Sequence, residues 1–276
     1  MEKHTFETPD INMVEALAAQ LLTVNRRLEE SNRQLKESEE ARMLMLSNIS
    51  HDLRAPLTAI RGALDRLLEG GITEEAERLS MISVIDRRVS ALEHLVGELY
   101  YSVSLDQPGF SLHLDKISLI PFLEEWFITH QYSSDGSQRD FNLDLPGNLE
   151  IFVCIDPERI VRVLDNLMQN ALKFTKPGDV IILSVRSDTE PDSLDSVEII
   201  LRDTGCGISP DDLSHIFERT YTASHSRTPS ERPGIGLGLS IAWNIVEKHG
   251  GVIRCESDYG KGSAFFIQLP LTRRDP

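Results

Sequence analysis

The chain has 276 residues, enough for about two domains of ordinary size, and it carries a formal net charge of -16 and three cysteines. The acidic excess argues against sequence-independent binding of nucleic acid, which needs a basic surface. The three cysteines lie far apart in the chain, which argues against a disulfide framework or a zinc site and favours a reducing, cytoplasmic setting. Because no apolar run approaches the length of about 18 residues that crosses a bilayer, we expect no membrane segment in this chain. A free protein and the cytoplasmic portion of a larger membrane protein both fit these features.

Residues 1–41 contain a heptad pattern that is typical of a parallel coiled coil. Its seam alternates spacings of three and four: Val14, Leu17, Leu21, Val24, Leu28, Ser31, Leu35 and Ser38. We interpret this segment as a coiled-coil signalling helix; a lone amphipathic helix packed on its own domain is the alternative. The apolar pattern gains one residue beside His51, since it continues at Leu53 rather than Asp52. Such a shift locally alters a supercoil, so we expect motion of the coiled coil to be felt first at His51.

Two further apolar stripes predict a helical hairpin over residues 42–103, with a turn at Gly70-Gly71. His51 lies about 200° around the first helix from Ile49, so we expect its imidazole to face water. One hairpin leaves apolar surface uncovered, and pairing two copies into a dimeric four-helix bundle would cover it. The stripes comprise Ile49, Leu53, Pro56, Ile60, Ala63 and Leu67, and then Ile82, Ile85, Val89, Leu92, Val96, Leu99 and Val103.

Residues 104–110 change composition and predict a hinge, and residues 111–276 alternate between strand and helix patterns. This alternation predicts an α/β sandwich with a mixed sheet. The expected strands are 112–114, 141–145, 151–155, 180–186, 197–202, 252–256 and 263–269, and the expected helices are 119–132, 157–174, 211–217 and 239–249.

The helix expected after Asp156 carries Asn166, Asn170 and Lys173 at spacings of four and three, which places them along one face. Two amides and an ammonium group can offer oxygen to a magnesium ion and positive charge to phosphates. A surface helix with solvated polar residues is the alternative interpretation.

The motif DTGCGI begins at Asp203, directly after an expected strand. Gly205 and Gly207 allow the backbone to approach a flat ligand, and an ionised Asp203 can accept a hydrogen bond from an exocyclic amino group such as that of adenine. A tight turn that merely needs glycine is the alternative.

The motif GIGLGLSIA has glycines at alternate positions before an expected helix: Gly234, Gly236 and Gly238, with Leu237 between them. Bare backbone amides at a helix N-terminus suit phosphate oxygens. The preceding polar stretch, residues 220–233, lacks periodicity and predicts a lid or an ordinary surface loop. Arg219, just before it, is a candidate phosphate contact.

Together these motifs resemble those of the sensor histidine kinases of two-component signalling. HDLRAPLTAI resembles the phosphoacceptor box, DNLMQNALKFT the asparagine box, DTGCGI and GIGLGL the glycine boxes and IFER the phenylalanine box, in the family's order from residue 43 to residue 270. The resemblance implies a dimeric phosphotransfer domain, residues 42–103, and an ATP-binding domain, residues 111–276. The latter would have the Bergerat fold that chaperone, gyrase and mismatch-repair ATPases share.

By this resemblance, Asn170 would hold Mg²⁺, Asp203 would bind the adenine of ATP, and Lys173 with the loop 234–238 would bind the phosphates. Asn166 stands where the related ATPases have a catalytic glutamate. Because this chain lacks that glutamate as a base to activate water, we expect phosphoryl transfer to be favoured over hydrolysis.

His51 would attack the γ-phosphorus of ATP, and Asp52 would orient the other ring nitrogen and take its proton. The phosphoryl group would then pass to an aspartate on a response regulator receiver domain. Many relatives carry Thr or Asn where this chain has Ala55, and that polar group is associated with dephosphorylation of the regulator. The resemblance therefore leaves phosphatase activity open.

Two other functions are compatible with these motifs. A GHKL-type ATPase whose helices only dimerise would hydrolyse ATP without phosphorylating itself, and a non-catalytic scaffold would bind nucleotide without either reaction. Phosphate on a histidine, which is labile in acid and stable in base, distinguishes the kinase from both.

Overall fold

The computed structural model describes residues 11–69, 74–105, 107, 109–132, 138–147, 150–187, 196–221 and 236–271. The chain divides into two compact units, residues 1–51 and 52–276, which we describe separately. Gly234 and nearly all of the polar loop 220–233 lie outside the described residues.

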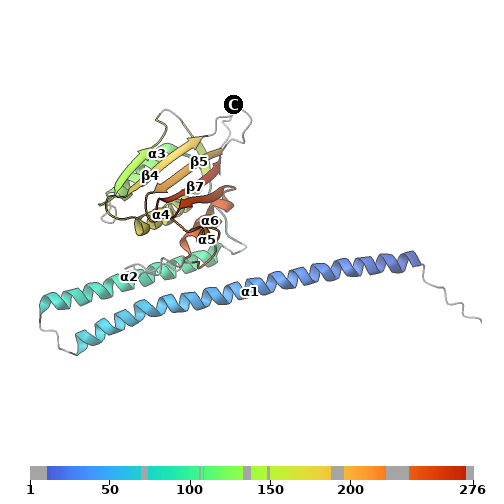
Figure 1. The fold of residues 1–276 in the computed structure, drawn as a ribbon, viewed down its shortest axis with the longest axis horizontal. Coiled ribbons are helices and arrows are strands. Elements are labelled where there is room, and N and C mark those ends of the chain that lie inside the picture. Colours follow the sequence, from blue (N-terminus) through green and yellow to red (C-terminus); the bar gives the residue numbers. More distant parts are fainter. Residues whose placement is uncertain are drawn as a thin grey trace, which may run out of the picture. The chain divides into compact units, whose positions relative to one another are not determined.

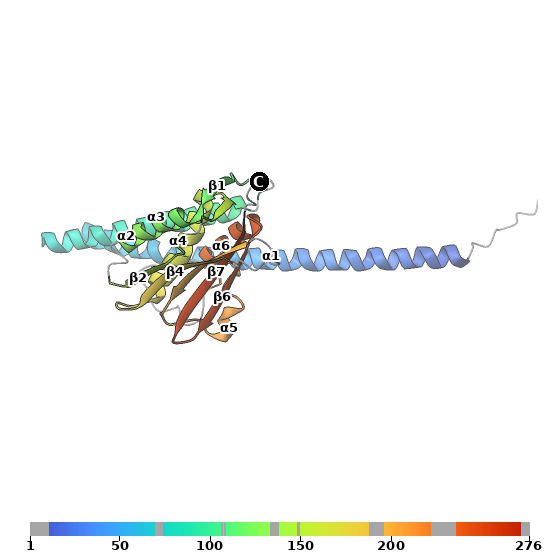
Figure 2. The same cartoon turned by 90° about the horizontal axis from the view of Figure 1, so that it is seen from above.

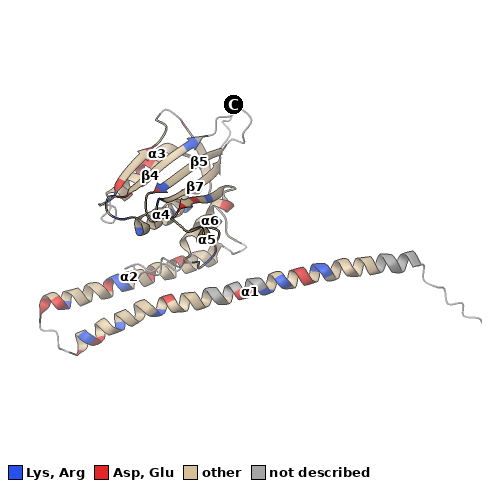
Figure 3. Cartoon of the chain, in the orientation of Figure 1, with Lys and Arg blue, Asp and Glu red and all other residues tan. Residues whose placement is uncertain are grey.

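Helix α1 (Ile11–Leu68) begins in the first unit and contains the expected coiled-coil segment. Lys and Arg alternate with Asp and Glu along it (Figure 3), and i,i+3 and i,i+4 pairs such as Arg33–Glu30 at 2.8 Å and Lys36–Glu40 at 3.8 Å link them. The seam is exposed in the single chain, with 57 to 62% of Leu21, Val24, Leu28 and Leu35 accessible to solvent. Such a seam is covered when a second helix packs against it.

The second part of α1 and helix α2 (Glu75–Leu105) form the hairpin of the second unit (Figure 1). Pro56 and Ala63 of the predicted α1 stripe are buried, and Pro56 lies inside the helix without ending it. The α2 stripe is only partly covered, because its valines and Ile82 are 40 to 54% exposed. The buried α2 side chains are Leu95, Glu98, Tyr101, Ser102 and Leu105.

The expected mixed sheet is confirmed as five strands in the order β2-β4-β5-β7-β6, in which β2 and β4 are parallel and all other neighbours are antiparallel. A separate antiparallel pair joins β1 and β3. The strands are β1 (Asp115–Ser118), β2 (Asp140–Asp144), β3 (Phe152–Ile155), β4 (Val180–Ser187), β5 (Ser196–Asp203), β6 (Val252–Asp258) and β7 (Gly262–Pro270).

Helices α3 (Leu119–Gln131), α4 (Pro157–Phe174) and α6 (Gly238–Lys248) lie on one face of this sheet (Figures 1 and 2). The core forms where their apolar faces meet alternate strand residues. Leu164, Leu183, Ile199 and Ile245 are all fully buried there. This packing supplies most of the stability of helices of this length.

Two expected elements are wrong in position. The strand expected at 112–114 is β1, shifted to Asp115–Ser118, because pairing with β3 selects the register from Asp115 opposite Ile155 to Ser118 opposite Phe152. The helix expected at 211–217 is only α5 (Pro210–Leu213). Ser209 caps it, and hydrogen bonds three residues apart then replace the helical pattern, from the His215 amide to the Asp212 carbonyl and from the Glu218 amide to the His215 carbonyl.

Candidate nucleotide-binding site

Helix α4 provides the central polar face of the site. It begins at the expected cap, where Asp156 accepts a hydrogen bond from the Arg159 amide and Pro157 occupies the first turn. Asn166, Asn170 and Lys173 follow along one face, and their exposure rises in that order from 7% at Asn166. The Asn166 amide nitrogen donates to the Gly238 carbonyl at 3.0 Å, which fixes α4 against the start of α6.

The DTGCGI segment lies against the C-terminal end of α4, because the Cys206 amide donates to the Phe174 carbonyl at 3.2 Å. Asp203 is only 6% exposed, and its Oδ1 accepts from the Gly205 amide at 2.8 Å. Burial raises the pKa of Asp203, while backbone hydrogen bonds from Gly205 and Ser263 oppose that shift. A buried carboxylate oriented in this way is suited to accept a hydrogen bond from a ligand amino group.

The GIGLGL segment is held at its Gly236 end. The Thr220 amide donates to the Gly236 carbonyl at 3.1 Å, so Thr220, the residue after Arg219, lies beside the start of α6. Gly236 has φ +72, and a side-chain Cβ there would lie 2.3 Å from the Tyr221 carbonyl oxygen. Only glycine meets both conditions without strain. Leu237 is fully buried, and Gly238 begins α6.

The structure therefore brings together motifs that are far apart in the sequence. Helix α4 contacts the DTGCGI segment at Phe174 and the GIGLGL segment at Asn166. These three segments and the turn beside them contain the following predicted residues: Asn170, Lys173, Asp203, Gly205, Gly207, Arg219, Gly236, Leu237 and Gly238.

Partial burial of the ammonium group lowers the pKa of Lys173.

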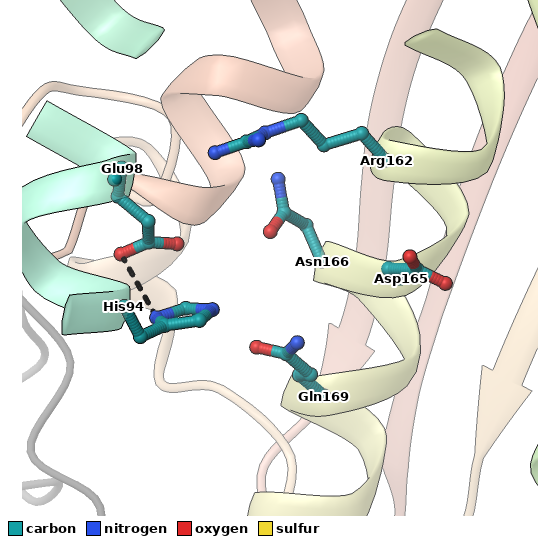
Figure 4. Close-up of a pocket in the computed structure, with 7 residues that line it drawn as sticks. His94, Glu98, Arg162, Asp165, Asn166 and Gln169 are labelled. Atoms are coloured by element: carbon teal, nitrogen blue, oxygen red, sulfur yellow. Dashed lines mark ion pairs between the residues drawn. The ribbon is translucent and has the colours of Figure 1, made fainter. Parts of the chain in front are cut away.

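A polar pocket of about 210 Å³ lies between α2 and α4, and the sequence motifs did not predict it. His94 and Glu98 of α2 face Arg162, Asn166 and Gln169 of α4 (Figure 4). The Glu98 carboxylate is 4.0 Å from His94 Nδ1. Burial raises the pKa of Glu98, although the charges of His94 and Arg162 act in the opposite direction. In the sequence, Glu98 is one of several acidic residues of α2, and only the structure shows that it is buried.

Thiol reactivity provides a test of this arrangement. Cys154 and Cys206 are exposed, whereas burial, together with the Asp203 and Glu256 carboxylates, raises the pKa of Cys255 to about 12. We expect iodoacetamide at pH 8 to modify Cys154 and Cys206 and to spare Cys255, because the thiolate is the reacting form. We also expect MgADP to slow modification of Cys206 and not of Cys154, as measured by peptide mass spectrometry. Equal protection of both thiols would contradict the location of the site.

The fold and the site define a nucleotide-binding α/β sandwich that follows a helical hairpin. Comparison with known proteins agrees with this class for both parts of the chain. Residues 155–273 match the family described as histidine kinase-, DNA gyrase B-, and HSP90-like ATPase, and residues 41–108 match the His Kinase A (phospho-acceptor) domain. The chain belongs to the sensor histidine kinases, as the resemblance of its motifs predicted.

The relatives include the sensor protein SrrB of Staphylococcus aureus, strain N315, which is 32% identical over 231 residues, or 82% of this chain and 37% of SrrB. The chain thus spans well under half the length of the curated relatives that it matches. Among solved structures, histidine kinase ThkA in complex with response regulator protein TrrA has a TM-score of 0.66 at 24% identity, covering 83% of this chain and 62% of that one. Acinetobacter baumannii histidine kinase AdeS has a TM-score of 0.60 at 22% identity, covering 81% and 98%. These structures share the fold.

Two kinds of feature are absent from the described residues. No helix in this part of the chain combines the length and the apolar character that crossing a membrane requires. No group of three or more His, Cys, Asp and Glu side chains in these residues could hold a metal ion.

Proposed function

We propose that this chain is an ATP-dependent protein-histidine kinase that phosphorylates itself on His51 and passes the phosphoryl group to an aspartate of a response regulator. One observation carries the proposal. The chain that presents His51 as an exposed side chain, on a helix of the segment that matches a phospho-acceptor domain, also brings three separate motifs together within the segment that matches an ATPase family.

In this proposal, the adenine amino group of ATP binds the buried Asp203 carboxylate. The phosphates lie between Lys173 and the segment up to Gly238, where the first amides of α6 face the negative charge. Asn170 offers a side-chain oxygen to Mg²⁺. A single amide oxygen fits this ion because Mg²⁺ commonly keeps several waters and takes its remaining ligands from the nucleotide phosphates. Bound Mg²⁺ would neutralise charge on the transferring phosphoryl group.

The chemistry of transfer depends on His51. A neutral imidazole nitrogen is nucleophilic near neutral pH. As the nitrogen bonds to the γ-phosphorus, the bond to the β,γ-bridging oxygen breaks and ADP leaves with the electron pair. Asp52, the next residue, is placed by sequence to orient the ring and accept its proton. The ATPase domain must reach His51 for this step, and we propose residues 104–110 as the hinge.

The proposed partners are a second copy of this chain and a response regulator receiver domain. The exposed apolar residues of α1 and α2 support a homodimer, because in both helices they recur at the spacing that helices use to pack together. The regulator is supported by the fold shared with ThkA, which has been solved in complex with response regulator TrrA.

Incubation of the purified chain with ATP labelled at the γ-phosphate and Mg²⁺ tests the proposal. We expect a phosphoprotein whose label is lost in acid and retained in base, and which transfers to a receiver domain. ATP hydrolysis without a labelled protein would instead indicate a GHKL-type ATPase. Label that survives acid would indicate phosphate on serine or threonine.

A further inference from the structure

A buried histidine at the end of α6 connects the two helices that flank the proposed phosphate site. His249 is 7% exposed, and its Nδ1–H donates to the Ile245 carbonyl at 2.7 Å. Its Nε2 therefore carries a lone pair, which accepts a hydrogen bond from the backbone amide of Asp156 at 3.0 Å. Burial lowers the pKa of His249, which keeps the ring in this neutral form.

Asp156 is itself fixed on three sides. Its Oδ1 accepts from the Arg159 amide at 3.2 Å, and its Oδ2 accepts from the His113 amide at 3.0 Å. It is the N-cap of α4 and only 5% exposed. The histidine thus connects the C-terminal end of α6 to a rigid point at the N-terminal end of α4.

A second polar contact joins the same two helices at the opposite end of α6, where Asn166 of α4 donates to the Gly238 carbonyl. Asp156 and Asn166 are ten residues apart, and Gly238 and His249 are eleven apart. At 1.5 Å per residue the two pairs span about 15 and about 17 Å, so an antiparallel α6 meets α4 at both contacts without distortion. Between them the two helices are joined by apolar packing, which resists separation more than sliding or rotation.

We propose that His249 is a positioning residue for the nucleotide: its hydrogen bond to Asp156 sets the orientation of α6 on α4 and thereby aims the first amides of α6 at the phosphates. This inference rests on the proposed function, which places the phosphates beside Gly238. Loss of the contact would leave α6 attached through Asn166 and its apolar face, free to rotate about that point. The amides at its N-terminus would then no longer converge on the phosphate oxygens with α4.

Two substitutions at His249 separate the hydrogen bond from the volume of the side chain. His249→Leu fills the space but offers no acceptor to the Asp156 amide, whereas His249→Gln can place an amide oxygen near the position of Nε2. We expect His249→Leu to raise the Kd for MgADP and the KM for ATP by about tenfold or more, while kcat for labelling of His51 falls less than threefold. We expect His249→Gln to restore the Kd to within about threefold of the unsubstituted chain.

His130 offers a matched control for a purely structural role. It is also a histidine near the end of a helix, its Nδ1 donates to the Trp126 carbonyl at 3.0 Å, and its Nε2 contacts Asp165 of α4 at 3.3 Å. That contact joins α4 to α3 rather than to α6. We therefore expect His130→Leu to lower the free energy of unfolding, as His249→Leu does, but to leave the Kd for MgADP unchanged.

The experiment compares the full chain and the three variants by isothermal titration with MgADP, by urea unfolding, and by steady-state labelling at varied ATP. The inference is overturned if His249→Leu binds MgADP like the unsubstituted chain, if His249→Gln binds no better than His249→Leu, or if His130→Leu weakens binding to the same extent. Failure of the unsubstituted chain to bind MgADP would overturn the proposed function, and this inference with it. Binding of MgADP without labelling of His51 would contradict only the proposed kinase activity. The comparison of Kd values among the variants would then still test the role of His249.

Discussion

Replacement of His51 by glutamine should abolish incorporation of labelled phosphate, with at least about a thousandfold loss of rate. Glutamine is polar and similar in length, so the exposed position on α1 accommodates it, but its amide nitrogen is not a nucleophile. The substitution leaves every residue assigned to the nucleotide intact, so the Kd for MgADP should not change. Phosphorimaging of the denatured protein and calorimetry with MgADP provide the two measurements.

The matched control is His94→Gln. His94 is also an exposed histidine on the hairpin with a carboxylate nearby, since Glu98 is 4.0 Å away. We expect this variant to retain labelling. The assignment of the acceptor would be wrong if His94→Gln lost the label and His51→Gln kept it.

Gly205→Ala should have the second largest effect, because it damages the adenine contact and the fold together. A Cβ at Gly205 would lie 2.3 Å from the Phe174 carbonyl oxygen and 2.9 Å from Asp203 Oδ1. The backbone must move, which disrupts the Gly205 hydrogen bond to Asp203 and the Cys206 hydrogen bond to Phe174. Overpacking of this kind costs up to about 3 kcal/mol, or about a hundredfold in affinity where the loss falls on binding.

Gly147→Ala is the corresponding control, because no atom lies within 4 Å of a Cβ built there. Urea unfolding and MgADP titration of both variants separate stability from binding. We expect Gly147→Ala to match the unsubstituted chain in both. MgADP binding by Gly205→Ala at the original affinity would mean that the segment from Asp203 to Gly207 does not contact the nucleotide.

Much of the candidate site could be proposed from the sequence because its chemistry is local. The cap at Asp156, the helical spacing of Asn166, Asn170 and Lys173, and the glycines that need close approach or positive φ each leave a signature within a few residues. The order of strands and helices followed from the same local patterns. These local patterns predicted the fold class correctly, and the resemblance of the motifs predicted the family correctly.

The burial of α2 shows where local patterns were insufficient. The apolar stripe predicted a bundle seam, but Leu95 and Tyr101 lie off that stripe and are buried at 3% and 7% exposure. The Tyr101 ring packs against the guanidinium group of Arg162, whose centre is 3.9 Å from the ring centroid. This contact joins residues about 60 positions apart, and helical periodicity carries no information about which distant element approaches a face.

The sequence by itself determined most of the helical and strand segments, because hydrophobic period, capping and glycine placement act over one or two turns of chain. The candidate acceptor and the candidate nucleotide-binding residues followed from the resemblance of the motifs to a family. Only the tertiary structure decided that β1 lies at Asp115–Ser118, that a polar pocket forms beside Asn166, and that His249 meets Asp156. Each of these depends on a hydrogen bond or a packing contact between segments far apart in the chain, and such contacts exist only after the sheet and its helices have assembled.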